Sequence, residues 1–270
     1  MLITDLVAAT DTSTTTADLD IGIVYTHERR YMPRLLETMA LAAGNMNVRL
    51  ILVDNASDDD QRMCLASFPR ASVIHNQQRL SYAANLNRIL RVATAPYVLL
   101  MNTDMHFEPS EPCLEKMAAF MDRHPRCGLS VCRLHHPGGG YAWPARRFQT
   151  PRIIAARRLS IARRMQRDLA DYFYHDRDHF GAFDCDWVSG CFMFLRRAAA
   201  AEVGLFDERF VKYFEDVDYS ARMHRAGWRV MFNGDTYCYH HEQRASRRLL
   251  SGDAYRHLAG YARWLVKRAS

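Results

Sequence analysis

The chain has 270 residues, of which 49% are hydrophobic and 24% are charged, a composition that excludes disordered, collagenous and fibrous proteins. Its apolar runs fall well short of the roughly 18 residues of a membrane span, and its N-terminus lacks the pattern of a cleaved secretion signal, so we expect a cytoplasmic protein. The net charge of +6 leaves three kinds of partner open: nucleic acid, a membrane surface or an anionic substrate.

The first half of the chain alternates short apolar runs with helical patterns. Residues 1–18 are expected to form a flexible N-terminal arm. The apolar runs predict strands over 21–25, 48–53, 72–74 and 97–101. Helices are expected over 33–43, after the polar turn 55–60, and over 83–92. Continuous apolar strands separated by helices are typical of an α/β protein with a mostly parallel central sheet flanked by helices.

The second half is less regular but carries no linker that would divide the chain. We expect helices over 111–124, 216–226 and 253–267, and strands over 187–195, 228–233 and 236–240. One domain therefore spans 19–245, and the C-terminal helix in 246–270 packs on it or beside it. The segment Arg146 to Arg167 holds eight arginines and no acid.

The seven cysteines predict buried, reduced thiols. Their number is odd and no C-x-x-C pair occurs, so the pattern favours neither a disulfide framework nor a zinc site. Free cysteines usually behave as small hydrophobic side chains of the core.

Polar residues stand where the predicted strands end, and ligands bind beyond the carboxyl ends of such strands. Asp104 follows the strand 97–101 in Asn102-Thr103-Asp104, where a carboxylate can hold a hard divalent cation or simply cap a turn. Asp54 ends the strand 48–53 and could accept a hydrogen bond from a base or a ribose, or form an Asx turn. His240 becomes a candidate metal ligand if Asp104 is one.

Three carboxylates gather at the start of the helix predicted over 216–226: Glu215, Asp216 and Asp218. Helix N-termini favour acids, so capping explains one or two of them. The neighbouring Tyr213 and Phe214 are apolar, and such surroundings raise the pKa of a carboxylate and make it a usable general base.

Seven segments of the chain carry a resemblance when they are taken in their order: 23–29, 52–58, 76–85, 102–104, 187–190, 206–218 and 225–230. They resemble the motifs of family 2 glycosyltransferases with the GT-A fold, especially the bacterial rhamnosyltransferase-like branch. Asn102 stands where the family has the first acid of its D-x-D metal motif, and Ser81 stands where a glycine is usual, so we expect weaker metal affinity and a more restricted backbone.

The resemblance implies a role for each matched residue. The base would be Asp216, and the ligand for Mg²⁺ or Mn²⁺ would be Asp104, with His240 as the second candidate ligand. The residues that would line the sugar or acceptor site are Trp187, Gly190 and Glu215. The residues that would bind the donor are Tyr25, Thr26, Asp54, Arg79, Asn85 and Asn102.

The implied activity is inverting transfer of a sugar, with L-rhamnose suggested by the branch, from a dTDP- or UDP-sugar to a saccharide or lipid-linked acceptor in cell-surface polysaccharide synthesis. The arginines of Arg146 to Arg167 lie among spaced aliphatic residues, which suits either an amphipathic helix on an anionic membrane at the inner face of the plasma membrane or a solvated lid.

Two other classes remain open. A basic nucleic-acid-binding protein without catalysis would explain the charge but not the acids at strand ends, so no nucleic acid is expected. A nicotinamide dehydrogenase would share the alternating pattern, but no G-x-G-x-x-G follows the first strand.

Overall fold

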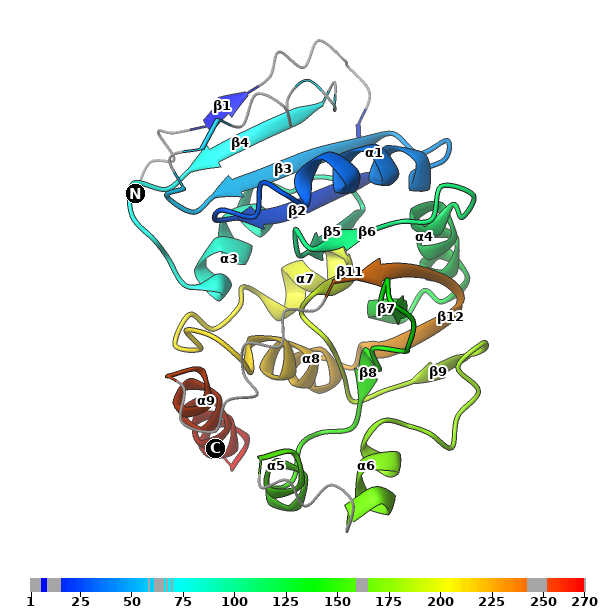
Figure 1. Ribbon diagram of the computed structural model, residues 1–270, viewed down its shortest axis with the longest axis vertical. Helices are drawn as coiled ribbons and strands as arrows, with labels where there is room; N and C mark the ends of the chain where they lie inside the picture. Colours follow the sequence, from blue (N-terminus) through cyan, green and yellow to red (C-terminus); the bar gives the residue numbers. More distant parts are fainter. Residues whose placement is uncertain are drawn as a thin grey trace.

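A computed structural model describes residues 6–8, 16–57, 59–60, 66, 68, 70–158, 165–241 and 252–269. Figure 1 shows strands stacked along the upper two thirds of the molecule, with α5, α6 and α9 at the end away from β1. None of the described helices is long and apolar enough to cross a membrane. The helices are α1 Met32–Ala42, α3 Tyr82–Val92, α4 Cys113–Arg123, α5 Pro151–Arg158, α6 Gln166–Tyr172, α7 Arg197–Val203, α8 Glu215–Arg225 and α9 Gly252–Ala269. The strands are β1 Leu6–Ala8, β2 Leu19–Tyr25, β3 Val48–Asp54, β4 Ala71–His75, β5 Tyr97–Met101, β6 Met105–His106, β7 Cys127–His135, β8 Ala145–Arg146, β9 Ala182–Asp184, β10 Trp187–Val188, β11 Phe192–Arg196 and β12 Arg229–His240.

The described strands form one large sheet in the order β1-β4-β3-β2-β5-β11-β7-β12-β6, with β9 on β12, and a small second sheet of β10 and β8. Strands β4, β3, β2 and β5 run parallel, as do β7 and β12. Strand β11 is antiparallel to both of its neighbours. The expected α/β architecture with a mostly parallel central sheet flanked by helices is confirmed, and the structure adds that the sheet is mixed.

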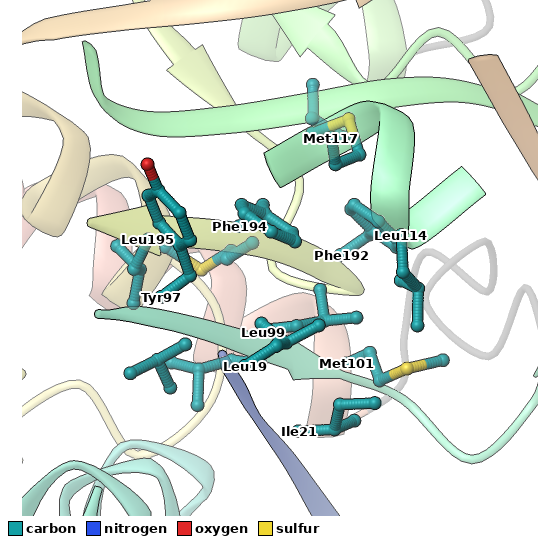
Figure 2. Close-up of a cluster of buried hydrophobic side chains, with 14 of the residues drawn as sticks. Leu19, Ile21, Tyr97, Leu99, Met101, Leu114, Met117, Phe192, Phe194 and Leu195 are labelled. Atoms are coloured by element: carbon teal, nitrogen blue, oxygen red, sulfur yellow. The ribbon is translucent and has the colours of Figure 1, made fainter. Parts of the chain in front are cut away.

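The core lies on both faces of this sheet. Cross-strand neighbours from β2, β5 and β11 share one face with Leu114 and Met117 of α4, as Figure 2 shows for residues such as Leu99 and Phe194. Gly22 of β2 faces the other way, and a Cβ there would lie 2.4 Å from Ile89 of α3. Because neighbouring residues of a strand point to opposite faces, α3 and α4 cover opposite faces of the sheet.

Several elements differ from the sequence prediction. The single strand expected over 187–195 is two strands in two sheets, because the chain turns at residues 189–191 between β10 and β11. The two strands expected over 228–240 form one strand, β12, interrupted by an irregularity between Asn233 and Tyr237. Strand β7 is absent from the prediction. Within the expected flexible arm, residues 6–8 form β1 on β4. The helix expected after 55–60 falls largely outside the described residues.

A second apolar cluster joins α9 to the rest of the molecule. Trp264 and Tyr261 of α9 pack with Phe214, Trp187 and residues of α5. The helix expected over 253–267 is therefore present as α9 and is packed on the domain. The thiols also match expectation: six cysteines are free and buried, and Cys64 lies outside the described residues.

Candidate functional site

The ends of β2 and β3 form a compact polar corner. Tyr25 donates a hydrogen bond from its hydroxyl to Asp59 at 2.6 Å, and Glu28 accepts the backbone N–H of Thr26 at 2.8 Å. Asp54 is buried; its Oδ1 accepts the backbone N–H of Ser57 at 3.0 Å, and its Oδ2 lies 3.2 Å from the His75 Nδ1. Asp54 thus stabilises the turn after β3 through the N–H three residues on, one residue further than in an Asx turn, and its carboxylate also orients His75.

The segment 76–85 is shaped by buried amide side chains. Asn85 is fully buried; its amide donates to the Ser81 carbonyl at 3.0 Å and its oxygen accepts from Asn76 at 2.6 Å. It therefore holds the loop from inside rather than facing a ligand. Ser81 accepts from the Ala84 N–H as the N-cap of α3, with φ −64°, so this position needs no glycine. Arg79 is exposed at the loop surface.

Tyr82 connects the end of β5 to the turn between β10 and β11. Its hydroxyl lies 3.0 Å from the Oδ1 of Asn102 and 3.1 Å from the carbonyl of Gly190. Burial, with added repulsion from the charge of Glu215, raises the pKa of Tyr82 well above its ordinary value, so the hydroxyl remains a donor. Tyr82 is not among the site residues predicted from the sequence, although it directly follows the N-cap serine in the segment with the family resemblance.

Asp104 and His240 meet because β6 pairs with the end of β12, which sets His240 opposite Met105. The His240 Nε2 lies 3.3 Å from the Asp104 Oδ1. Burial alone would raise the pKa of Asp104, but the hydrogen bond and charge of His240 lower it below its ordinary value. Burial likewise opposes a charged His240 ring, yet Cys191 and Asp104 outweigh it and raise the pKa of His240.

The donor atoms of this pair fit a divalent cation once His240 gives up the proton that it shares with Asp104, because only the neutral ring can bind a metal. Neighbouring ligands of a cation bound at about 2.1 Å lie about 3 Å apart, close to the 3.3 Å between Asp104 and His240. The carboxylate oxygen suits Mn²⁺ or Mg²⁺, whereas an imidazole nitrogen is a ligand for transition metals rather than for Mg²⁺, so the pair favours Mn²⁺. Within the described chain no cluster of three or more such side chains occurs, so a cation here would take its remaining ligands from substrate phosphate and water.

Glu215 and Asp216 are presented by a turn of unusual backbone conformation. Tyr213 and Phe214 both have φ of +71°, which is strained for bulky side chains. Asp216 accepts the Gly190 N–H at 2.9 Å and the Val217 N–H at 2.8 Å. A Cβ on Gly190 would come within 3.3 Å of the Asp216 carboxylate, so a small residue permits this close approach.

The two carboxyl groups differ in their surroundings. Glu215 is buried, and its Oε2 has no hydrogen-bond partner among the described residues. Burial, followed by the charge of Asp216, raises the pKa of Glu215 to about 8. Burial also raises the pKa of Asp216, although the Gly190 and Val217 N–H groups oppose the shift. The two neighbouring carboxyl groups therefore differ in their affinity for a proton.

The remaining predicted residues frame this pair. Trp187 is buried and donates from its indole to the Arg147 carbonyl at 2.7 Å. The guanidinium of Arg146 lies 4.9 Å from the centre of the Trp187 ring, and its charge helps to stabilise ionised Asp216. Asp218 takes no part in this arrangement. It forms an ion pair with Lys267 of α9 at 2.8 Å and so anchors the C-terminal helix.

Solved structures share this fold. The chain matches a mannosyltransferase from Pyrobaculum calidifontis in complex with GDP-Man and Mn²⁺ with a TM-score of 0.60 and 15% identity, covering 93% of this chain and 65% of that one. It matches GalNAc-T7 with UDP, GalNAc and Mn²⁺ with a TM-score of 0.64 and 13% identity, covering 93% of this chain and 48% of that one. The fold is therefore GT-A-like, and the chain spans about half to two thirds of these structures.

The sequence comparison identifies the family to which the protein belongs. The model of Glycosyl transferase family 2 matches residues 20–204, more than half of the chain, and the protein belongs to that family. This membership decides against the noncatalytic nucleic-acid-binding alternative and against a dehydrogenase. The chain is also 25% identical over 245 residues to an N-acetylglucosaminyl-diphospho-decaprenol L-rhamnosyltransferase of Mycobacterium tuberculosis, covering 86% of this chain and 77% of the relative.

Proposed function

We propose that the protein is an inverting glycosyltransferase that moves a sugar from a nucleotide-diphosphate donor to a saccharide or lipid-linked acceptor. L-Rhamnose from a dTDP-sugar is the specific donor we propose, since the curated relative is named as an L-rhamnosyltransferase acting on a diphospho-decaprenol-linked sugar. Cell-surface polysaccharide synthesis at the inner face of the plasma membrane is the setting that such an acceptor implies.

One observation carries this proposal: a hydrogen-bonded path links the end of β5 to the carboxylate pair. It runs from Asn102 through the Tyr82 hydroxyl to the carbonyl of Gly190, and from the N–H of the same glycine to Asp216. The strand end is where an α/β sheet binds nucleotides, and Asp216 lies at the other end of the path. A sugar held between them would have its diphosphate on one side and a base on the other, as inversion requires.

Each group in the site then has a chemical task. Asp104 and His240 would hold the cation, which when bound stabilises the negative charge of the departing diphosphate. Asp216 takes the proton of the acceptor hydroxyl as that oxygen forms its bond to the anomeric carbon and the bond from carbon to diphosphate oxygen breaks. Raised basicity suits this role, because burial raises the pKa of Asp216. Arg79, exposed at its loop, is available to the diphosphate.

Nucleotide and metal dependence test the proposal. We expect dTDP or UDP with Mn²⁺ to raise Tm in a thermal-shift assay, and EDTA to remove both the shift and hydrolysis of nucleotide sugars. The variant Asp104→Ala should lose the metal-dependent shift while keeping its own fold, because the residue lies beyond the strand end. Asp235→Ala, which removes a largely exposed acid, is the matched control. Activity in wild type that persists unchanged in EDTA would contradict the assignment of the cation.

A further inference from the structure

The outer face of α9 is apolar although it is exposed. Tyr255, Leu258, Leu265 and Val266 have exposed fractions of 76%, 48%, 40% and 73%. They make up half of the exposed large hydrophobic side chains of the described chain. At 100° per residue they fall on one stripe of the helix together with Ala262. A concentrated exposed stripe, unlike scattered apolar residues, marks an interaction surface.

Basic side chains border this stripe. Arg256 and Arg263 are exposed and each directly follows a residue of the stripe, Tyr255 or Ala262. The charged side chains that the structure describes on α9 are all basic, and Arg256, Arg263 and Arg268 are exposed, whereas Lys267 pairs inward with Asp207 and Asp218. An apolar stripe edged by cations is the pattern of a helix that lies in a membrane interface, where long basic side chains reach the headgroups.

The inner face of α9 sets this surface beside the carboxylate pair. Gly260 lies so close to the turn before α8 that a Cβ there would come within 3.0 Å of Phe214 and 3.1 Å of the Tyr213 carbonyl. Lys267 pairs with Asp218 of α8 at 2.8 Å. One side of α9 thus supports the turn that presents Glu215 and Asp216, and the other side faces out of the molecule.

We propose that the outer face of α9 docks on an anionic phospholipid bilayer. The match of cationic border to anionic lipid favours this occupant over a protein partner, and no described helix could instead span the membrane. The inference rests on the proposed function, which gives the docking a purpose: a lipid-linked acceptor would reach the site from the bilayer. Figure 1 shows α9 at the same end of the molecule as α5, the first helix of the arginine-rich segment.

The test measures vesicle binding without donor or acceptor. We expect the wild-type protein to sediment with phosphatidylcholine vesicles that contain phosphatidylglycerol, less so in high salt, and little with pure phosphatidylcholine. Leu258→Gln combined with Val266→Gln should lower this binding at least about tenfold, because each buried methylene contributes about fourfold. Both side chains are exposed, so Tm should be unchanged. Leu41→Gln combined with Leu205→Gln, exposed leucines elsewhere, should bind as wild type does.

Three results would overturn the proposal: sedimentation of the α9 variant equal to wild type, no sedimentation of wild type with anionic vesicles, or light scattering that shows a wild-type dimer which the α9 variant dissociates. The last result would assign the stripe to a second copy of the chain. The proposed function is tested separately, by measuring nucleotide stabilisation and donor hydrolysis in the absence of lipid.

Discussion

Asp216 is positioned as a base by two backbone N–H groups and a glycine that allows close approach. We predict that Asp216→Asn lowers turnover about a hundredfold or more, with nucleotide affinity little changed, because a general base acts mainly in the transition state. Steady-state kinetics and nucleotide titration measure the two effects. If Glu215→Gln is the crippled variant and Asp216→Asn is nearly normal, the base is Glu215.

Glu215 offers a pH test of its buried state. Burial and the charge of Asp216 raise its pKa to about 8, whereas the unfolded chain has an ordinary glutamate pKa near 4.3. Between these values the folded protein holds a proton that the unfolded chain has lost, so this group destabilises the fold progressively as pH rises. Glu215→Gln removes the effect. The Tm of this variant relative to wild type should therefore increase from about pH 4.5 to about pH 8 and then level off.

The control for this experiment is Glu37→Gln on α1, which changes an exposed glutamate and should shift Tm by a small amount that is constant with pH. Thermal melts in a series of buffers measure all three proteins. A difference between Glu215→Gln and wild type that does not vary across this window would mean that Glu215 is ionised in the folded protein at neutral pH.

At the scale of elements, Gly260 of α9 lies close to the turn that precedes α8. Tyr213 and Phe214 both adopt the left-handed conformation, at a cost of order 1–3 kcal/mol for each residue, and α9 packs on this turn. The aromatic ring of Phe214 lies 5.7 Å from that of Tyr261 and 6.2 Å from that of Trp264. Packing of α9 therefore helps to maintain the strained turn that aims the carboxylates.

Gly260→Ala tests that contact. In an open helix position this change stabilises by roughly 1 kcal/mol, but here the added Cβ would press on Phe214 and the Tyr213 carbonyl. We predict a lower Tm together with lower turnover, since displacing the turn also displaces Glu215 and Asp216. Thermal melts and kinetics of the single variant suffice. A rise in Tm with full activity would show that α9 does not support the turn.

At the scale of the whole molecule, the excess of positive charge has two proposed locations, α9 and the segment Arg146 to Arg167. Each cation near an anionic membrane contributes about 1 kcal/mol at most, and salt screens it. We predict that replacing Arg157, Arg158, Arg163 and Arg164 by Gln weakens sedimentation with anionic vesicles and reduces its salt dependence. The side chains of these residues lie outside those that the structure describes.

Donor hydrolysis distinguishes the two roles considered for this segment. It should survive the fourfold substitution, because the proposed donor site is built at the ends of β2, β3 and β5. Loss of hydrolysis with unchanged vesicle binding would instead assign the arginines to a lid that contacts the diphosphate. The described neighbour Arg146, whose charge acts on Asp216, is left intact in this variant.

The sequence alone determined the alternation of strands and helices in the first half. Parallel strands covered on both faces must be continuously apolar, and β2, β3 and β5 carry that pattern without help from distant residues. It also located the polar groups at the strand ends, the carboxylates before α8 and the thiols of the core. Each of these features depends on local composition and spacing, which the sequence displays directly.

Only the tertiary structure decided which partners those groups meet. Strand β7 mixes small, polar and apolar residues, and becomes a central strand only because β11 and β12 flank it. Asp54 contacts Ser57 and His75, and Asp218 pairs with Lys267. The hydroxyl of Tyr82 contacts Asn102 and also Gly190, which lies 108 residues further along the chain than Tyr82. A local pattern specifies which side chains can be buried, but a hydrogen bond or an ion pair depends on where long-range packing brings its second atom.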